Sequence, residues 1–158
     1  HFYSQLPLEM NRADRYRQPL ALMMLDLDNF KQFNDVYGHM EGDRFLSLIG
    51  PMIRECLRKT DLAFRFGGDE FAILLPMTTL KGAEATAGRI QARLADKNLL
   101  PEGAGDFRVT VSIGIAKHRY EETPEEFLRR ADMFLYTSKK EGKDTVSLST
   151  SKKHFDHA

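Results

Sequence analysis

Apolar residues recur three and four positions apart in five segments of the chain, which is the spacing of one face of an α-helix. The first segment contains Pro7, which disfavours a regular first turn. The third contains Gly50-Pro51, where we expect a kink or a break because proline removes a backbone donor. The last opens on the capping box Thr123-Pro124-Glu125-Glu126. The five expected helices are 1–18, 29–37, 41–57, 80–94 and 124–140.

Short apolar or alternating runs between these segments predict strands. The first run is continuously apolar, as in a central strand covered on both faces, and Asp26 and Asp28 follow its end. Two further runs flank Gly67-Gly68 and predict a β-hairpin whose glycines adopt positive φ angles. The expected strands are 20–25, 62–66, 71–75, 107–116 and 145–148.

The order of these elements favours an α+β fold in the broad α/β class. Its simplest form is a ferredoxin-like βαββαβ core with added helices and strands around a mixed central sheet. A length of 158 residues predicts one domain, 1–158, with a loose polar tail at 149–158. Because the chain opens inside a helical pattern, we expect it to be a fragment of a larger protein.

Composition narrows the possible functions. The 23 basic and 23 acidic residues cancel, which argues against a broadly electrostatic nucleic-acid binder. The single cysteine, Cys56, excludes an intrachain disulfide and suits a reducing compartment, so we expect a cytoplasmic location. No apolar run approaches the roughly 20 residues that span a bilayer, so direct membrane insertion is not expected.

Acidic residues at strand ends are the strongest chemical signal. In a mixed sheet the first strand and the hairpin can lie side by side, which would bring Asp26 next to Asp69 and Glu70. Crowded carboxylates repel one another unless a cation neutralises them. Hard oxygen ligands favour Mg²⁺, with Mn²⁺ as the alternative, and so a metal-assisted phosphoryl or nucleotidyl transferase. The competing interpretation is a charged hairpin tip with no function.

Other ways of binding a cation or a nucleotide do not fit. An EF-hand loop starting at Asp26 fails because Phe30 stands at its fifth position and Lys31 replaces its glycine. The chain has no Walker-type or dinucleotide-binding glycine loop. Phosphates would therefore be held by backbone N–H groups at 29–31 and by Lys139 and Lys143.

The hairpin carries the run Gly67-Gly68-Asp69-Glu70-Phe71, and further distinctive blocks are 26–35, Tyr37-Gly38-His39, Gly42-Asp43, 111–115, Ala131-Asp132, and Tyr136 before Lys139. Together these blocks resemble the signature and the supporting motifs of the GGDEF family of diguanylate cyclases. All follow the family's order and spacing over nearly the whole chain. The resemblance implies a fold similar to the catalytic domain of class III adenylyl cyclases and the polymerase palm.

The resemblance also implies roles for individual residues. The metals would be bound by Asp26, the carbonyl of Leu27, Asp69 and Glu70, of which Asp69 and Glu70 would also act in catalysis. Asn34 and Asp43 would read the guanine edge. For Asp43 the physical reason is that its carboxylate can accept hydrogen bonds from the N1–H and 2-amino groups, which guanine has and adenine lacks. The other substrate-binding positions would be Phe30, Lys31, Gly67, Gly68, Lys139 and Lys143. The family often has arginine at position 143, where this chain has lysine. A lysine offers a point charge in place of a bidentate donor, so we expect a weaker contact with the triphosphate.

A second motif of the family lies before the hairpin. Arg58-Lys59-Thr60-Asp61 has the form and position of the RxxD site that binds the product and inhibits the enzyme. Arg89 stands where the family carries a further arginine for this site. Arginine can clamp phosphates and stack on guanine, as a bound cyclic dinucleotide would require.

These resemblances predict an enzyme that condenses two GTP into cyclic di-GMP and two pyrophosphates. One domain would hold one GTP, so a homodimer is expected, together with a sensor or dimerisation region N-terminal to this chain. The alternative is an inactive GGDEF domain that serves as a receptor for GTP or cyclic di-GMP. A ferredoxin-like RNA-binding module is less suitable, because the candidate strands lack interleaved aromatic and basic residues.

Overall fold

The computed structural model describes residues 1–148, and within them five strands form one mixed sheet in the order β2-β3-β1-β4-β5. Neighbouring strands are antiparallel except β4 and β5. This arrangement confirms the predicted α+β class and ferredoxin-like core. The tail at 149–158 lies outside the described residues. The elements are α1 (Phe2–Tyr16), β1 (Leu20–Asp28), α2 (Phe30–Tyr37), α3 (His39–Glu55), β2 (Leu62–Arg65), β3 (Glu70–Pro76), α4 (Leu80–Leu94), a 3₁₀ turn (Lys97–Leu99), β4 (Thr110–Lys117), α5 (Pro124–Lys140) and β5 (Val146–Leu148).

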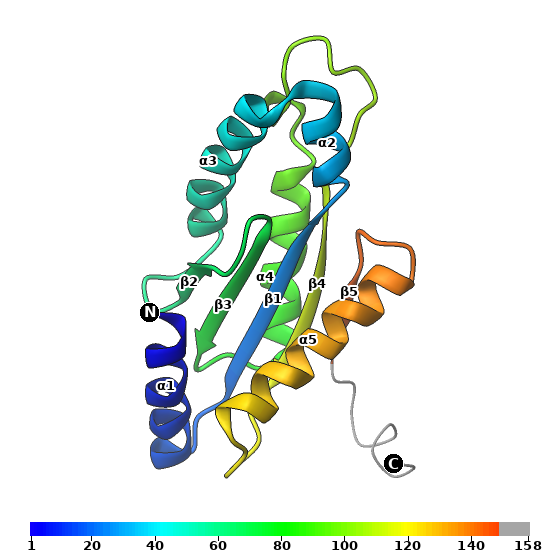
Figure 1. The fold of residues 1–158 in the computed structure, drawn as a ribbon. Helices are drawn as coiled ribbons and strands as arrows, with labels where there is room; N and C mark the ends of the chain where they lie inside the picture. The colour runs from blue at the N-terminus through cyan, green and yellow to red at the C-terminus, as the bar shows by residue number, and fades with distance from the viewer. Residues whose placement is uncertain (149–158) are drawn as a thin grey trace.

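The sheet separates two hydrophobic cores, because successive side chains of a strand point to opposite faces. Odd-numbered residues of β1 join the core beneath α2, α3 and α4, whereas Leu20, Leu22 and Met24 join the core beneath α1 and α5. In Figure 1, α4 lies behind the sheet and α1 and α5 lie in front of it. The same alternation directs Asp26 and Asp28 to the face that carries α5.

Helix α5 packs directly onto β4 at Gly114. A side chain there would collide with the backbone of α5 at Ala131 and Leu135, so only glycine permits this approach. Further along α5, the hydroxyl of Ser138 donates to the carbonyl of Ile113 at 2.7 Å. The C-terminal end of α5 is therefore held beside the acidic end of β1.

Helix α1 reaches the hairpin with its N-terminal end. The ring of Phe2 packs edge-on against Phe64 of β2 and against Phe66, with centroids 5.6 and 5.3 Å apart. The ring of Tyr3 lies 5.8 Å from that of Phe66. The position of the hairpin thus depends on contacts with α1.

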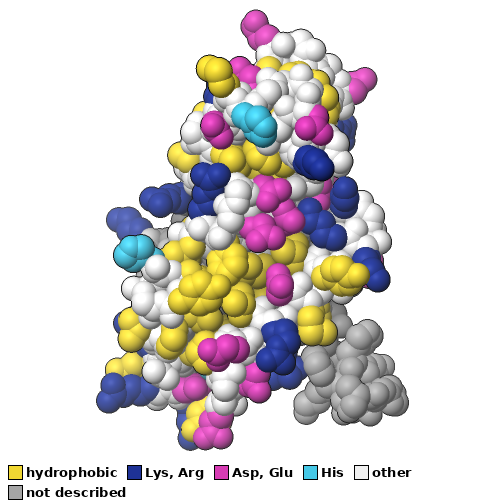
Figure 2. Space-filling model, viewed as in Figure 1, with side chains coloured by type: hydrophobic (Ala, Val, Ile, Leu, Met, Phe, Trp, Pro, Cys, Tyr) yellow, Lys and Arg dark blue, Asp and Glu magenta, His cyan; other side chains and the backbone are white. Residues whose placement is uncertain are grey.

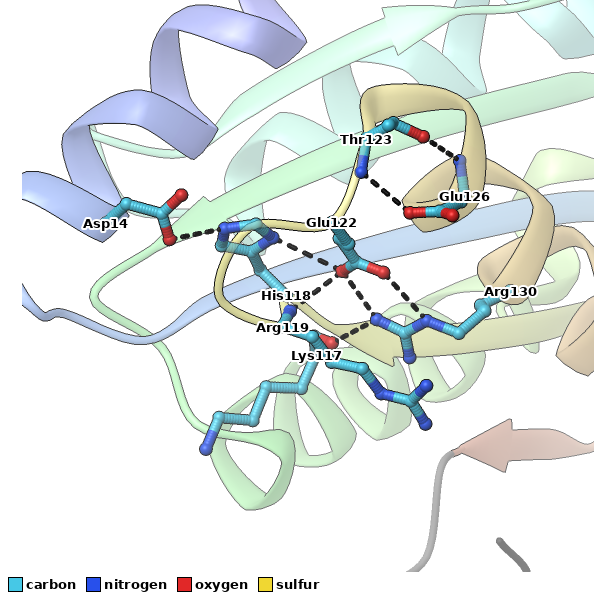
Figure 3. Close-up of polar contacts among 8 residues, drawn as sticks. All are labelled: Asp14, Lys117, His118, Arg119, Glu122, Thr123, Glu126 and Arg130. Carbon is cyan, nitrogen blue, oxygen red and sulfur yellow. Dashed lines mark hydrogen bonds and ion pairs between the residues drawn. The ribbon is translucent and has the colours of Figure 1, made fainter.

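The other end of α1 is fixed by a buried histidine, shown in Figure 3. His118 follows β4, and its Nε2 lies 2.8 Å from Asp14 Oδ1 of α1 while its Nδ1 lies 3.2 Å from Glu122 Oε1. Arg130 of α5 donates to both oxygens of Glu122, at 3.1 and 2.7 Å. The backbone N–H of Arg119 also donates to Glu122, at 2.8 Å. This cluster joins α1 to α5 at the end of the sheet remote from the acidic residues.

Strand β1 is longer than predicted. It continues through Asp28 instead of ending at Leu25, because it remains paired with β3 as far as Asp26 and with β4 as far as Asp28. Asp26 lies opposite Glu70 of β3, and Asp28 lies opposite Thr110 of β4. The acids therefore belong to the sheet and have fixed directions.

Helix α3 also differs from the prediction. It begins at His39 and runs through Pro51 to Glu55, so the expected break is wrong. Ile49 and Ile53 are buried in the same core on either side of the proline, and this packing offsets the missing backbone donor. At 17 residues α3 and α5 are still short for a membrane span, and no helix of the described region is long and apolar enough to cross a bilayer.

The histidine cluster makes stability depend on pH. Burial would lower the pKa of His118, but hydrogen bonds to Glu122 and Asp14 outweigh it and raise this pKa above 6.5. Burial would raise the pKa of Glu122, but hydrogen bonds from His118 and Arg130 lower it to about 2. Stabilisation by protonated His118 is complete below pH 6.5 and is lost as the pH rises through its raised pKa. Stabilisation by ionised Glu122 is present above pH 4.5 and is lost as the pH falls toward 2.

We therefore expect His118→Gln to lower the melting temperature strongly at pH 5.5 and weakly at pH 9. A loss of about 1–2 kcal/mol at pH 5.5 corresponds to about 2–8 °C in a domain of this size. Circular dichroism melts at the two pH values measure the difference, with the exposed His39→Gln as the control. An equal loss at both pH values would contradict a charged His118.

Candidate active site

Two strands and the turn between β2 and β3 bring three acidic residues, Asp26, Asp69 and Glu70, to one end of the sheet. Asp26 of β1 lies directly opposite Glu70 of β3. The N–H of Leu27 donates to the carbonyl of Asp69 at 3.1 Å, which brings the end of the hairpin turn against β1. The structure thus brings Asp26, Asp69 and Glu70 together, and Figure 2 shows acidic side chains gathered on this face between basic ones.

The acidic residues carry more negative charge than their surroundings neutralise. Burial raises the pKa of Asp26 to about 6, with Lys139 opposing the shift and Asp69 and Glu70 adding to it. Burial, followed by Asp132 and Asp69, also raises the pKa of Glu70. The Oδ1 atom of Asp26 is buried and has no hydrogen-bond partner among the described residues. A cation at this position would relieve both conditions.

The residues fit a hard divalent cation such as Mg²⁺. This ion is commonly bound by one or two carboxylates together with water and substrate phosphates, and Asp26 Oδ1 is an unpartnered oxygen ligand within residues 1–148. In the same range, no three Asp, Glu, His or Cys side chains come close enough to hold an ion by themselves. The site therefore suits an ion whose remaining ligands come from backbone, water or a nucleotide.

Asp28 lies on the same face of β1 as Asp26, but its pKa is shifted in the opposite direction. Burial would raise its pKa, yet hydrogen bonds outweigh burial and lower it. No role for Asp28 follows from the family motif. The sequence signal that could have pointed to Asp28 is its spacing of two residues from Asp26, because alternate residues of a strand lie on one face. Its partners are Lys139, Thr110, Ser112 and the backbone N–H of Asp144.

Two of the predicted phosphate-binding lysines lie near the end of β1. Lys139 Nζ is 2.6 Å from Asp28 Oδ1 and 3.5 Å from Asp26 Oδ2. Lys143 Nζ is 3.5 Å from Oδ1 of Asn29, the residue that follows β1. Lys139 therefore stands at the edge of the acidic cluster, and Lys143 lies beside the first residues of α2.

The start of α2 presents backbone donors and one lysine. Asn29 has a left-handed conformation with φ 63°, and no side-chain hydrogen bond caps the helix in the described part of the chain. Lys31 is exposed on the first turn. The ring of Phe30 is buried, 6.0 Å from the ring of Phe33 and 6.1 Å from that of Phe45. The side chain of Phe30 thus belongs to the core, which leaves its backbone for any contact with a substrate.

Helices α2 and α3 approach closely at the predicted guanine-reading residues. A side chain at Gly42 would collide with the amide of Asn34, so any larger residue there would displace that amide from its present position. Asn34 Oδ1 is buried without a hydrogen-bond partner among the described residues. Asp43 follows Gly42 and is exposed. The two polar side chains thus come from adjoining helices, and one of them has an unused acceptor.

The hairpin turn is not built as predicted. Neither Gly67 nor Gly68 adopts a positive φ angle. The loop spans residues 66–69, and loops of this length do not need the positive φ angles of two-residue turns. The guanidinium of Arg65 donates to the carbonyls of Gly67 and Gly68 at 3.2 and 2.8 Å. Both glycines are exposed, and a side chain at Gly68 would meet only open space.

The residues of the RxxD motif contact one another after α3. The backbone N–H of Arg58 donates to Asp61 Oδ2 at 2.8 Å, and its guanidinium lies 3.5 Å from Asp61 Oδ1. The same guanidinium donates to Thr78 Oγ1 and to the carbonyl of Pro76. Asp61 is buried, whereas the side chain of Arg58 is about half exposed. A ligand could therefore reach Arg58 from solvent.

Arg89 reaches the same corner from α4. Its guanidinium donates to Thr86 Oγ1 at 3.0 Å and to the carbonyl of Cys56 at 3.3 Å, two residues before Arg58. The structure thus places the three predicted inhibitory-site residues around the C-terminal end of α3. Both guanidinium groups are already hydrogen-bonded, so a ligand would have to replace some of these bonds.

The sequence matches the family described as "Diguanylate cyclase, GGDEF domain" over residues 1–145. Diguanylate cyclase A of Treponema denticola is 35% identical over 154 residues, covering 94% of this chain and 41% of the relative. Diguanylate cyclase DgcM of Escherichia coli K12 is 40% identical over 129 residues, covering 82% of this chain and 30% of the relative. The chain therefore spans less than half the length of these two relatives.

Solved structures of similar domains have the same fold. The GGDEF domain of DgcB from Caulobacter crescentus, in complex with c-di-GMP, superposes with a TM-score of 0.87 at 29% identity, covering 93% of this chain and 87% of that one. The GGDEF domain of PA1120 (YfiN or TpbB) from Pseudomonas aeruginosa gives 0.84 at 34% identity, covering 96% and 94%. Given the match over residues 1–145, this chain belongs to the GGDEF family of diguanylate cyclase domains.

Proposed function

We propose that the domain is an active diguanylate cyclase, which condenses two GTP into cyclic di-GMP and releases two pyrophosphates. The observation that carries this proposal is the meeting of Asp26, Asp69 and Glu70, with a buried Asp26 oxygen that lacks a partner among the described residues. A domain that only bound a nucleotide would not need this concentration of uncompensated acid. The curated relatives named above are diguanylate cyclases, which supports the same reaction.

The metal would be Mg²⁺, with Mn²⁺ as the alternative. Asp26, Asp69, Glu70 and the backbone carbonyl of Leu27 would hold it. When bound, such an ion stabilises negative charge that develops on the α-phosphate. Glu70 would also accept the proton of the ribose 3′-hydroxyl as a general base.

The reaction forms and breaks one bond at each phosphorus. The 3′-oxygen of one GTP bonds to the α-phosphorus of the other, the bond from that phosphorus to pyrophosphate breaks, and the hydroxyl proton leaves. Lys31, Lys139 and Lys143, with the N–H groups at the start of α2, would hold the β- and γ-phosphates. The open backbone at Gly67 and Gly68 would let the nucleotide lie against the turn.

Closing the ring requires two domains. Each would hold one GTP, with the two sites facing each other so that each 3′-hydroxyl meets the α-phosphate of the partner. We infer a homodimer for this reason. The greater length of the curated relatives is consistent with a sensor or dimerisation region N-terminal to this domain, and GTP as substrate implies a cytoplasmic site of action.

Purified, dimerised protein with GTP and Mg²⁺ should produce cyclic di-GMP and pyrophosphate in a 1:2 ratio, measured by chromatography. Asp69→Ala should lower turnover at least 100-fold, about 2.7 kcal/mol in the barrier, because it removes a proposed metal ligand. Glu84→Ala, an exposed acid on α4, should retain activity. A folded dimer that binds GTP but makes no product would favour the receptor alternative.

Asp43→Ala should reduce the preference for GTP over ATP. The carboxylate would accept hydrogen bonds from the guanine N1–H and 2-amino groups, so its loss should cost about 1.5–3 kcal/mol, or roughly 10–150-fold in relative kcat/KM. Competition between GTP and ATP measures this ratio. Glu41→Ala, which removes an acid from the same helical turn, is the control. Equal competition by ATP in the unmutated protein would rule out this role for Asp43.

Arg58→Ala should relieve inhibition by cyclic di-GMP and raise the inhibitory concentration about tenfold or more, since arginine–phosphate bonds are charge-assisted. Initial rates at increasing cyclic di-GMP measure the change. Lys59→Ala, adjacent and exposed but outside the paired Arg58 and Asp61, should leave inhibition unaltered. If Arg58→Ala is inhibited as strongly as the unmutated domain, the product site lies elsewhere.

A further inference from the structure

Asp28 is a buried carboxylate that none of these proposed roles uses. Its side chain is fully enclosed, with Oδ1 accepting from Ser112 Oγ at 2.8 Å and Lys139 Nζ at 2.6 Å. Its Oδ2 accepts from Thr110 Oγ1 at 2.7 Å and the N–H of Asp144 at 2.9 Å. A carboxylate has about four acceptor sites, so all are occupied. Asp28 therefore has no free lone pair for a metal ion.

The first consequence concerns Lys139. Its Nζ lies closer to Asp28, at 2.6 Å, than to the Asp26 carboxylate, at 3.5 Å. A lysine ammonium sits on a flexible four-carbon stem and loses freedom when it binds a phosphate. The hydroxyls of Ser112 and Thr110 fix the orientation of the Asp28 carboxylate, which in turn fixes the ammonium. The side chain of Lys139 remains one-quarter exposed, so a ligand can still reach it.

The second consequence concerns the turn that follows α5. Gly142, Lys143 and Asp144 have consecutive positive φ angles of 105°, 66° and 46°. This conformation is unfavourable for residues other than glycine. The hydrogen bond from the Asp144 N–H to Asp28 helps to hold the turn, and the turn carries Lys143. Figure 1 shows this turn beside the end of β1.

We propose that Asp28 is the positioning residue for the triphosphate of GTP. It holds Lys139 directly, beside Asp26, and holds the turn that carries Lys143, beside Asn29, so both cations are in place before the nucleotide arrives. It acts through the two lysines and contacts neither the metal nor the nucleotide. This inference rests on the proposed function and adds that one buried carboxylate makes the site select a triphosphate over a monophosphate.

Asp28→Asn tests the proposal, because the amide keeps the size of the side chain but removes the charge and one acceptor oxygen. The probes are 3′-deoxy-GTP, which lacks the attacking hydroxyl, and GMP, which lacks the β- and γ-phosphates. In calorimetry with Mg²⁺, the variant should bind 3′-deoxy-GTP about tenfold or more weakly and GMP unchanged. A merely structural role would weaken binding of both ligands alike.

Glu122→Gln is the matched control, since it also removes a buried carboxylate with several hydrogen bonds, at the opposite end of the sheet. It should lower the melting temperature and leave the ratio of the two affinities unchanged. In a Lys139→Ala background, Asp28→Asn should reduce that ratio by less than it does in the unmutated protein, because part of its effect passes through Lys139.

If Asp28→Asn does not fold, the double variant Thr110→Val/Ser112→Ala frees the carboxylate while retaining its charge, and it should lower the affinity ratio about threefold. An unchanged ratio in whichever of these variants folds would overturn the role of Asp28. If the unmutated protein binds 3′-deoxy-GTP no more tightly than GMP, the triphosphate site of the proposed function fails instead.

Discussion

The direct contact between the backbone of α5 and β4 at Gly114 holds Lys139 of α5 close to the acidic end of β1. With any larger residue, α5 would have to move outward, because the added atom would occupy the same space as the helix backbone. That displacement would carry Lys139 away from Asp28 and Asp26. Gly114 has no side chain and lies in the interior of the fold, yet the distances between Lys139 and the two acids depend on it.

The negative charges of Asp28 and Asp26 are compensated to different extents. Lys139 lies nearest to Asp28, whose remaining acceptors are filled by hydroxyl and backbone donors. Burial raises the pKa of Asp26 to about 6; Lys139, which is 3.5 Å away, opposes this shift, and the acidic neighbours Asp69 and Glu70 add to it. The protein stabilises one carboxylate fully and leaves the other to be neutralised by what binds there. Asp26 and Asp28 are thus only two residues apart, yet Asp28 is fully hydrogen-bonded and Asp26 has an oxygen without a partner among the described residues.

The features of the structure that could be predicted from the sequence are those that depend on residues close together in the chain. The five helices, the five strands and the capping box at Thr123 are found in the expected order, because each depends on neighbours in the chain. The conformation of Gly67 and Gly68 differs from the prediction because β2 ends at Arg65 and β3 begins at Glu70, which leaves a longer loop that does not need positive φ angles. The importance of Asp28 was also hidden, because its partners are about 80 to 115 positions away in the sequence and only the fold brings them together.

Helix α1 contacts the hairpin at its first turn and the end of β4 at its last turn, by different interactions. Aromatic rings join its first turn to the hairpin that bears Asp69 and Glu70, and an acid–imidazole contact joins its last turn to His118. Phe66, which the rings of Phe2 and Tyr3 contact, belongs to the same loop as Asp69. A displacement of the first turn of α1 would therefore disturb the packing of the loop that carries this acid.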